Sequence, residues 1–303
     1  MNNILDRSRT TGFGPKMTRR SLFRHGLRLA LLAALGVGFV RRDNLTVESV
    51  NLAFDTLPSA FAGFRIIQIS DLHASYWVDK AFLDRVVDQV NRMEKDLLVI
   101  TGDIITGAVN DFWSRWLPKA GGDHLETAID ALRNLSAGPK LAVLGNHDQW
   151  AGISTELRLV RELEGIGIGV LRNASCQLPR GDHSIAVAGT DDVWFTADAA
   201  KALKGIPQDQ FTVLLSHSPD IRNDLGPRSR VELTLCGHTH GGQVVIPYLT
   251  RRLMPIDNPE RYLAGLVQET YGYTYVNRGI GTLVFPLRFG APPEITTIVL
   301  NRA

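Results

Sequence analysis

Five times along the chain, a short apolar run of the kind that forms a buried strand ends in a cluster of Asp, Asn, His and Gly residues. The first run covers residues 64–70 and is followed by Asp71 and His73. The later clusters are Gly102-Asp103, Gly145-Asn146-His147-Asp148, Ser216-His217 and Gly237-His238-Thr239-His240. Because ligands of open α/β sheets gather at the carboxyl ends of strands, we expect the five clusters to lie together. This requirement constrains the fold strongly, since several strands must end side by side.

The spacing of apolar residues between these clusters predicts an α/β domain. Helices are predicted over residues 79–93, 124–135 and 154–164, the last with Ser154 as its N-cap. Strands of the first half are predicted over residues 64–70, 96–101, 141–144 and 168–171. The second half is richer in strands, which are predicted over residues 184–189, 212–216, 232–236, 243–246, 274–277 and 294–300. This order favours two packed sheets flanked by helices in one domain.

The charge of the chain is unevenly distributed. Residues 1–42 hold nine of the 33 Lys and Arg residues and one of the 31 acidic residues, which leaves 24 bases and 30 acids in the remainder. An acidic body argues against nucleic-acid binding, which needs a basic surface. The two cysteines, Cys176 and Cys236, exclude a disulfide framework and a four-cysteine zinc site.

The basic surplus belongs to a leader over residues 1–45, which we separate from a domain over residues 46–303. Residues 18–23 resemble a twin-arginine export signal, an address and not an anchor. The apolar run over residues 29–40 has twelve residues, whereas a spanning helix needs about 20. No Ala-x-Ala site follows it, so the leader is read either as an export signal or as an uncleaved anchor of the inner membrane. A basic amphipathic tail on the membrane surface is the alternative. Membrane contact is expected through residues 17–42.

The residue types of the five clusters indicate metal binding. Five of the eight histidines lie in them, accompanied by carboxylate and amide oxygens. Asp, Asn and His together suit Mn, Fe or Zn. A single Asp-x-His or Gly-Asn-His-Asp segment is more often a turn, but five such clusters in order, each after a strand, are typical of a metal site.

This ordered series of clusters resembles the calcineurin-like metallophosphoesterase superfamily. The resemblance covers about residues 62–300, and no ligand position of the family pattern is replaced. It implies a four-layer α/β/β/α sandwich of two packed mixed sheets flanked by helices. It also implies two divalent metal ions, Mn, Fe or Zn, and a reaction at a phosphoester bond.

Segments in the second half resemble one bacterial branch of this superfamily. They are Gly237-His238-Thr239-His240-Gly241-Gly242-Gln243, Val276-Asn277-Arg278-Gly279-Ile280-Gly281, Leu287-Arg288 and Pro292-Pro293-Glu294. The branch includes envelope phosphodiesterases with twin-arginine leaders and lies near the UDP-2,3-diacylglucosamine pyrophosphatases of lipid A synthesis. The resemblance therefore implies a place in the bacterial cell envelope, either associated with the inner membrane or exported by the twin-arginine route.

The resemblance also assigns ligands. One metal ion would be held by Asp71, His73, Asp103 and His240, and the second by Asp103, Asn146, His217 and His238. Asp103 would bridge the two ions, and a hydroxide that they share would attack phosphorus in line. Neutral Asn146 limits the negative charge and leaves the pair attractive to phosphate.

Other residues are assigned supporting roles, each with a structural alternative. His147 would steady the phosphoryl oxygens and protonate the leaving oxygen, or act only structurally. Asp148 would hold the tautomer of His147, or serve as a turn or cap residue. Arg278 and Arg288 would contact phosphate, or be ordinary ion-pairing arginines.

Aromatic residues lie beside two of the clusters. Tyr76 and Trp77 follow the first, and the segment 106–122 carries Phe112, Trp113 and Trp116 after the second. They would form a lid or an acyl-chain surface, or would pack beneath a long loop.

The sequence thus predicts a two-metal phosphodiesterase or pyrophosphatase of the envelope. UDP-2,3-diacylglucosamine, a lipid-linked UDP-sugar, is the most concrete substrate. A broad phosphoesterase acting on cell-wall or soluble phosphates is one alternative. A catalytically silent, metal-binding scaffold of the same fold is another, although scaffold relatives would be expected to lose ligands or His147.

Overall fold

The computed structural model describes residues 43–107, 115–116, 122–226 and 229–303, with scattered positions between residues 23 and 37. The chain divides into two units, Met1–Val37 and Gly38–Ala303. Arg19 and Arg20 of the predicted leader lie outside the described residues, as do most of the other residues in the range 17–42. Within the described part of the chain, no helix combines the length and apolarity that a membrane crossing requires.

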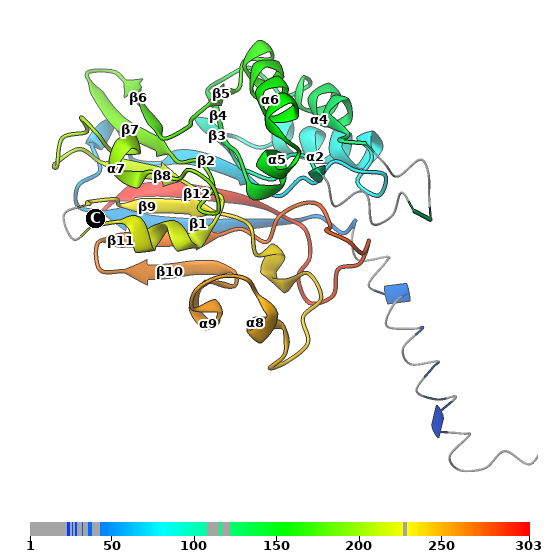
Figure 1. Ribbon diagram of the computed structural model, residues 1–303. Coiled ribbons are helices and arrows are strands. Elements are labelled where there is room, and N and C mark those ends of the chain that lie inside the picture. Colours follow the sequence, from blue (N-terminus) through cyan, green and yellow to red (C-terminus); the bar gives the residue numbers. More distant parts are fainter. Residues whose placement is uncertain are drawn as a thin grey trace, which may run out of the picture. The chain divides into compact units, whose positions relative to one another are not determined.

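The second unit contains two six-stranded mixed sheets (Figure 1). The first has the order β1-β12-β2-β3-β4-β5. β1 runs parallel to β12, β12 is antiparallel to β2, and β2 to β5 are parallel to one another. The bounds are β1 Thr46–Phe54, β12 Glu294–Arg302, β2 Phe64–Ile69, β3 Leu97–Thr101, β4 Lys140–Val143 and β5 Gly169–Val170.

The second sheet has the order β10-β11-β9-β8-β7-β6. Its centre is parallel, because β11, β9, β8 and β7 run the same way, and an antiparallel hairpin closes each edge. The bounds are β10 Gly265–Glu269, β11 Gly272–Val276, β9 Leu233–Cys236, β8 Thr212–Leu215, β7 His183–Gly189 and β6 Ala174–Arg180.

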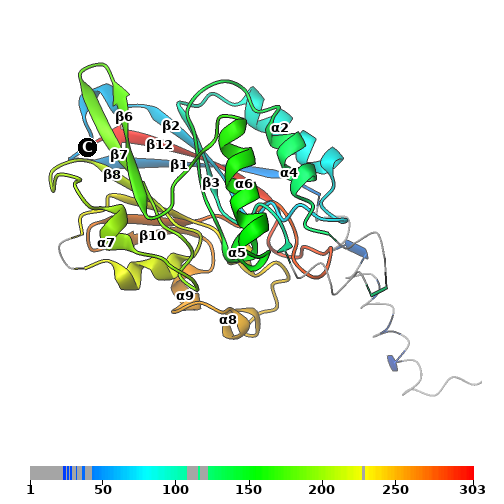
Figure 2. The same cartoon turned by 45° about the horizontal axis from the view of Figure 1, so that its top comes forward.

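The sheets pack face to face, and helices cover their outer faces. Successive side chains of a strand point to opposite faces, so Ile66 of β2 packs against the second sheet while Ile67 packs under the helices of the first. Those helices are α2 Lys80–Arg92, α4 Leu125–Leu132 and α6 Ile153–Gly165. Short elements cover the second sheet: α7 Ala199–Ala202, η4 Pro219–Asp224, α8 Thr250–Leu253 and α9 Pro259–Tyr262. The predicted α/β/β/α layers are therefore confirmed, as Figures 1 and 2 show.

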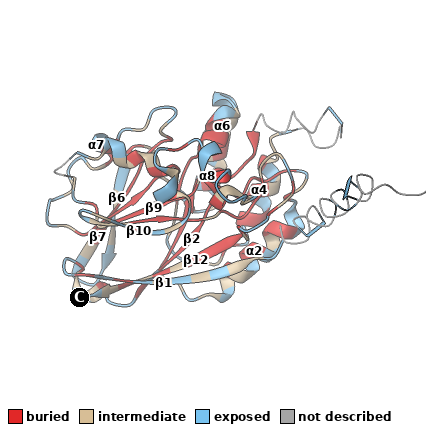
Figure 3. Cartoon of the chain, turned by 90° about the horizontal axis from the view of Figure 1, so that it is seen from below, coloured by how far each residue is buried: buried red, intermediate tan, exposed pale blue. Residues whose placement is uncertain are grey.

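Burial follows these layers. Figure 3 shows buried residues concentrated in the central strands and in the inward faces of the helices, whereas β1 and β6 expose much of their length. Cys236 is buried in β9. The remaining short helices are η1 Ser59–Phe61, α5 Asn146–Trp150 and η5 His240–Gly242.

Several local predictions were wrong or incomplete. The strand predicted over residues 243–246 forms only isolated bridges at Val244, because the chain turns just before it and Gln243 has a φ of 50°. Helix α6 begins at Ile153 with Gly152 as its N-cap, so Ser154 lies inside the helix. Strands β1, β6 and β10, like helix α5, were not predicted.

Candidate metal centre

The five polar clusters meet where strands of the two sheets end. Asp71 and His73 follow β2, Asp103 follows β3, and Asn146 begins helix α5 after β4. His217 follows β8, and the remaining two histidines of the set, His238 and His240, follow β9. The central parallel strands of each sheet end toward the same side, which is why sequence-distant residues converge there. The convergence expected from the sequence is therefore present in the structure.

The backbone at these positions is strained. Five of the seven predicted ligands have a positive φ: Asp71 (49°), His73 (46°), Asp103 (52°), His238 (71°) and His240 (52°). Left-handed backbone costs roughly 1–2 kcal/mol for a residue other than glycine. Strain of this kind gathers at functional sites, where the surrounding structure holds it in place. Here it brings the ligand atoms of these side chains close to one another at the ends of the strands.

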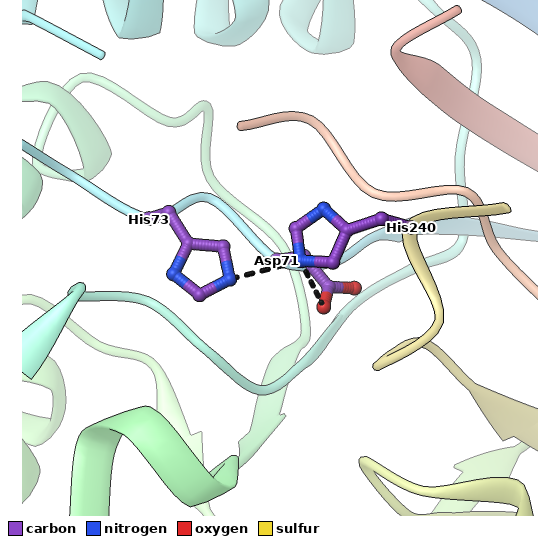
Figure 4. Close-up of side chains that lie close together, drawn as sticks. All are labelled: Asp71, His73 and His240. Atoms are coloured by element: carbon purple, nitrogen blue, oxygen red, sulfur yellow. Dashed lines mark hydrogen bonds and ion pairs between the residues drawn. The ribbon is translucent and has the colours of Figure 1, made fainter. Parts of the chain in front are cut away.

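The first group consists of Asp71, His73 and His240 (Figure 4). The Nε2 atoms of His73 and His240 lie 3.0 Å apart, and His240 Nε2 lies 3.3 Å from Asp71 Oδ1. All three side chains are buried. Burial lowers the pKa of His73 to about 3 and also lowers that of His240, so both imidazoles are neutral, as metal ligands must be.

The second group consists of Asp103, His217 and His238. His217 Nε2 lies 3.1 Å from Asp103 Oδ2 and 3.1 Å from His238 Nδ1. His217 Nδ1 donates to the carbonyl of Thr101 at 2.7 Å, which leaves Nε2 free to bind a cation. Asp103 Oδ2 also lies 3.4 Å from His73 Nε2, so this one oxygen faces both groups. It occupies the place of a bridging ligand.

The donor set fits metal ions. Bonds of about 2.1 Å to a Zn-type ion imply ligand atoms roughly 3.0–3.4 Å apart, which is the spacing within both groups. The buried Asn146 Oδ1 has no hydrogen-bond partner in the described part of the chain, as expected of an oxygen reserved for a cation.

The electrostatics also favour a cation. Although burial opposes charge on both side chains, attraction between them raises the pKa of His217 and lowers that of Asp103. The Asp103 carboxylate thus attracts positive charge to this position, and a metal ion bound at His217 Nε2 would take the place of the proton.

His147 lies beside the two groups without joining either. Its backbone N–H donates to Asp103 Oδ1 at 2.9 Å, and its Nδ1 lies 3.0 Å from the carbonyl of Thr106. The ring contacts that of His73 edge-on, with centroids 4.9 Å apart. A hydrogen bond from Nδ1 to the Thr106 carbonyl leaves Nε2 for a substrate. This placement suits proton transfer to a leaving oxygen.

Asp148 does not hold the His147 tautomer, contrary to the predicted role. Its Oδ1 accepts hydrogen bonds from the N–H groups of Ile104 and Ile105 at 2.9 and 3.0 Å, and its Oδ2 accepts from Gly145 at 2.9 Å. The carboxylate therefore ties the loop after β3 to the loop after β4. The structural alternative, a turn or cap residue, describes Asp148 better, because it caps helix α5 through Gly145. The Thr106 carbonyl fixes the His147 imidazole instead.

Arg278 and Arg288, which were predicted either to contact phosphate or to be ordinary ion-pairing arginines, are engaged with groups of the chain itself. Arg288 is fully buried and donates at 2.9 Å to the carbonyls of Gly281, Arg278 and Ala291. Arg278 forms ion pairs of 2.6 Å with Glu48 and Glu294. Neither guanidinium lines the cavity described next. Both arginines instead join the chain segments that support the metal ligands.

A cavity of about 440 Å³ opens beside the metal-ligand groups. Its polar wall includes Asp103, Asn146, His147, His238 and His240, and its apolar wall consists of Trp150, Trp194, Met254, Pro255, Leu283 and Val284. The organic part of a substrate bound at the metal ions would therefore meet mostly apolar side chains.

The two tryptophans of this wall were not singled out from the sequence. Their rings lie 5.3 Å apart; Trp150 contacts the His147 ring at 4.9 Å, and Trp194 contacts the His238 ring at 5.0 Å. Trp150 lies three residues after His147, about one helical turn further along the chain. This spacing was the sequence signal that could have placed Trp150 beside His147.

Of the aromatic residues predicted to form a lid or acyl-chain surface, or to pack beneath a long loop, none that the structure describes lines the cavity. Tyr76 and Trp77 contact each other and do not line the cavity. Trp116 is exposed, while Phe112 and Trp113 fall outside the described residues.

The family model for calcineurin-like phosphoesterases matches residues 64–242, more than half of the chain. The chain belongs to this family. Its members use two divalent metal ions, and the two groups of ligands can hold such a pair. The chain is accordingly a metal-dependent phosphoester hydrolase.

Known proteins of the family resemble the chain over most of its length. It is 34% identical over 283 residues to an uncharacterized metallophosphoesterase, YkuE, of Bacillus subtilis, covering 90% of this chain and 92% of the relative. It is 28% identical over 239 residues to the phosphodiesterase YaeI of Escherichia coli, covering 79% and 83%. Among solved structures, a dimetal phosphatase from Danio rerio has a TM-score of 0.43 and 14% identity, covering 72% and 88%.

Proposed function

We propose that this hydrolase cleaves phosphodiester or pyrophosphate bonds of the bacterial envelope, in substrates whose organic part is apolar or lipid-linked. The observation that carries the proposal is the cavity that joins both ligand groups and His147 to a wall of Trp150, Trp194, Met254, Pro255, Leu283 and Val284. A relative, the YaeI protein of E. coli, is named a phosphodiesterase, which supports the class of bond.

Different residues would have different roles in such a reaction. Two metal ions, when bound, neutralise phosphate charge and supply a nucleophile at neutral pH. His147 donates a proton from Nε2 to the leaving oxygen, while Thr106 holds the opposite nitrogen. Asp148 keeps the loops that carry Asp103 and His147 in register.

The apolar wall bears on the choice of substrate. UDP-2,3-diacylglucosamine combines a pyrophosphate with acyl chains, and it is the most concrete candidate. Its lipid part would pack against the apolar side chains while the pyrophosphate faces the metal ions. Attachment through residues 17–42, on the inner membrane, would bring the enzyme to this lipid.

A broad phosphoesterase acting on cell-wall or soluble phosphates is the second candidate. It is favoured by a twin-arginine leader, since export would place the domain outside the cytoplasm. A catalytically silent scaffold is disfavoured, because the chain retains every candidate ligand of the family pattern and His147.

Hydrolysis of bis(p-nitrophenyl) phosphate with and without Mn²⁺ tests the proposed class. We expect turnover that requires the metal and is lost, together with metal uptake, in Asp103→Ala. The exposed Asp130 on α4 provides a matched control, Asp130→Ala, which keeps both. Turnover retained by Asp103→Ala would contradict a reaction that depends on both ligand groups.

The lipid-linked substrate is tested by comparing UDP-2,3-diacylglucosamine with UDP-N-acetylglucosamine, which lacks the long acyl chains. We expect a higher kcat/KM for the acylated compound, and a preference that shrinks in Trp194→Ala. Equal rates on both compounds would favour the broad phosphoesterase.

A further inference from the structure

Two segments beside the cavity present an apolar surface to solvent, which we term the loop face. Tyr248 is 89% exposed and Leu253 is 71% exposed. The loop face consists of Val244, Ile246, Tyr248, Leu249, Leu253, Phe285 and Phe289, each more than a third exposed. Large apolar side chains scattered singly are ordinary on protein surfaces, whereas a contiguous group marks an interaction site.

The two segments form one surface because Gln243 joins them. Its Nε2 donates to the carbonyls of Leu283 and Phe285 at 3.0 and 3.1 Å, and its Oε1 accepts from the Leu283 N–H at 2.7 Å. Backbone hydrogen bonds of 2.8 Å join Val245 to Phe289 and Phe289 to Gln243. The exposed side chains are therefore held on a fixed frame.

The loop face continues from the apolar wall of the cavity. Met254 lines the cavity and follows Leu253 directly, and Leu283 and Val284 line it immediately before Phe285. Gln243 in turn follows helix η5, which begins with the metal ligand His240. An apolar path thus leads from the metal centre to solvent.

The charged side chains of these two segments are all basic. Residues 243–256 and 280–293 contain no Asp or Glu, and their exposed arginines are Arg251 and Arg252. Arg251 pairs with Glu260 at 2.5 Å, while the Arg252 side chain has no ion-pair partner among the residues that the structure describes. Exposed apolar and aromatic side chains beside an arginine without an ion-pair partner are suited to a surface that rests on anionic lipid.

We propose that the loop face binds an anionic lipid bilayer and turns the mouth of the cavity toward the lipid. The proposal rests on the proposed function in one respect, the lipid-linked substrate. A second copy of the chain fits less well, because a symmetric contact would bring the same patch, and with it Arg252, against itself. The bilayer lets each apolar side chain enter the interface while the arginine meets lipid phosphate.

Sedimentation of the full chain with phosphatidylcholine vesicles, with and without phosphatidylglycerol, tests this surface. The double variant Tyr248→Ser/Leu253→Ser removes two apolar anchors, and Ile153→Ser/Leu157→Ser makes the same change on the exposed face of α6. The wild type and both double variants keep the leader, so any lipid binding by the leader contributes equally to all three. We expect roughly tenfold weaker binding in the first variant and none of this loss in the second. Arg252→Gln should weaken binding only when phosphatidylglycerol is present.

Equal vesicle binding by the wild type and Tyr248→Ser/Leu253→Ser would overturn the proposal. So would a concentration-dependent dimer that the same variant abolishes, because the loop face would then bind a second copy. Turnover of bis(p-nitrophenyl) phosphate is measured in parallel and should be unchanged in the variant, since neither residue lines the cavity. Vesicle binding without any turnover would reject the proposed function and leave the lipid surface standing.

Discussion

His147 is held by two neighbours in a way that leaves one ring nitrogen for chemistry. We expect His147→Gln to lower kcat by about 10²–10⁴ without changing metal content. The loss should grow from a p-nitrophenyl to a phenyl leaving group, because a poorer leaving group depends more on the proton. Steady-state kinetics and metal analysis measure both. His183→Gln, at an exposed histidine, is the control, and an equal loss with both leaving groups would reject the acid role.

For Arg288 we expect a loss of stability and not of catalysis, since its guanidinium donates to backbone carbonyls and not to a substrate. Arg288→Met should lower the free energy of unfolding by roughly 2–5 kcal/mol, because three buried carbonyls lose their donor. Urea unfolding measures this, with Arg133→Met on the surface of α4 as the control. A raised KM with unchanged stability would restore the phosphate-binding role predicted from the sequence.

At the scale of elements, the tight approach of two loops depends on a glycine. A Cβ on Gly145 would lie 2.2 Å from Asp103 Oδ1 and 2.5 Å from its backbone nitrogen, although the φ of −102° suits any residue. We therefore expect Gly145→Ala to displace Asp103 and to lose metal and activity together. Metal content after dialysis is the measurement. Gly165→Ala, where a Cβ meets open space at the end of α6, should leave metal content unchanged.

The elements that the sequence predicts well are those with strong local patterns. Strands β2, β3, β8 and β9 are continuous apolar runs, and the clusters after them carry most of the metal ligands. Helix α5 is only five residues long, which is too short for a periodic pattern, so the sequence did not predict it. Residues 243–246 look like a strand because three of the four are apolar, yet Val244 and Ile246 are exposed and belong to the loop face.

At the scale of the whole molecule, the site could be predicted because five sequence clusters share one structural context. The order of the strands could not. β12, the last strand, inserts between β1 and β2, and no local pattern reports a pairing across some 230 residues. The cavity wall could not be predicted for the same reason, because Trp194, which follows β7 of the second sheet, contacts Trp150, which follows β4 of the first, only through the packing of the two sheets.

The leader predicted over residues 1–45 would decide the compartment in which the domain acts, and this prediction can be tested independently of the fold. A reporter that is active only outside the cytoplasm, fused to the C-terminus, should be active with the natural leader. It should be silent when Arg19 and Arg20 become Lys, because the twin-arginine pair is read as an address and lysine does not reproduce guanidinium geometry.

The two outcomes separate the candidate substrates. Export that depends on both arginines favours phosphodiesters outside the cytoplasm, and the loop face would then meet the outer surface of a membrane. A reporter silent with either leader would contradict export and make residues 17–42 an anchor on the cytoplasmic side. UDP-linked lipids are met on that side, so the same result would make UDP-2,3-diacylglucosamine the leading substrate.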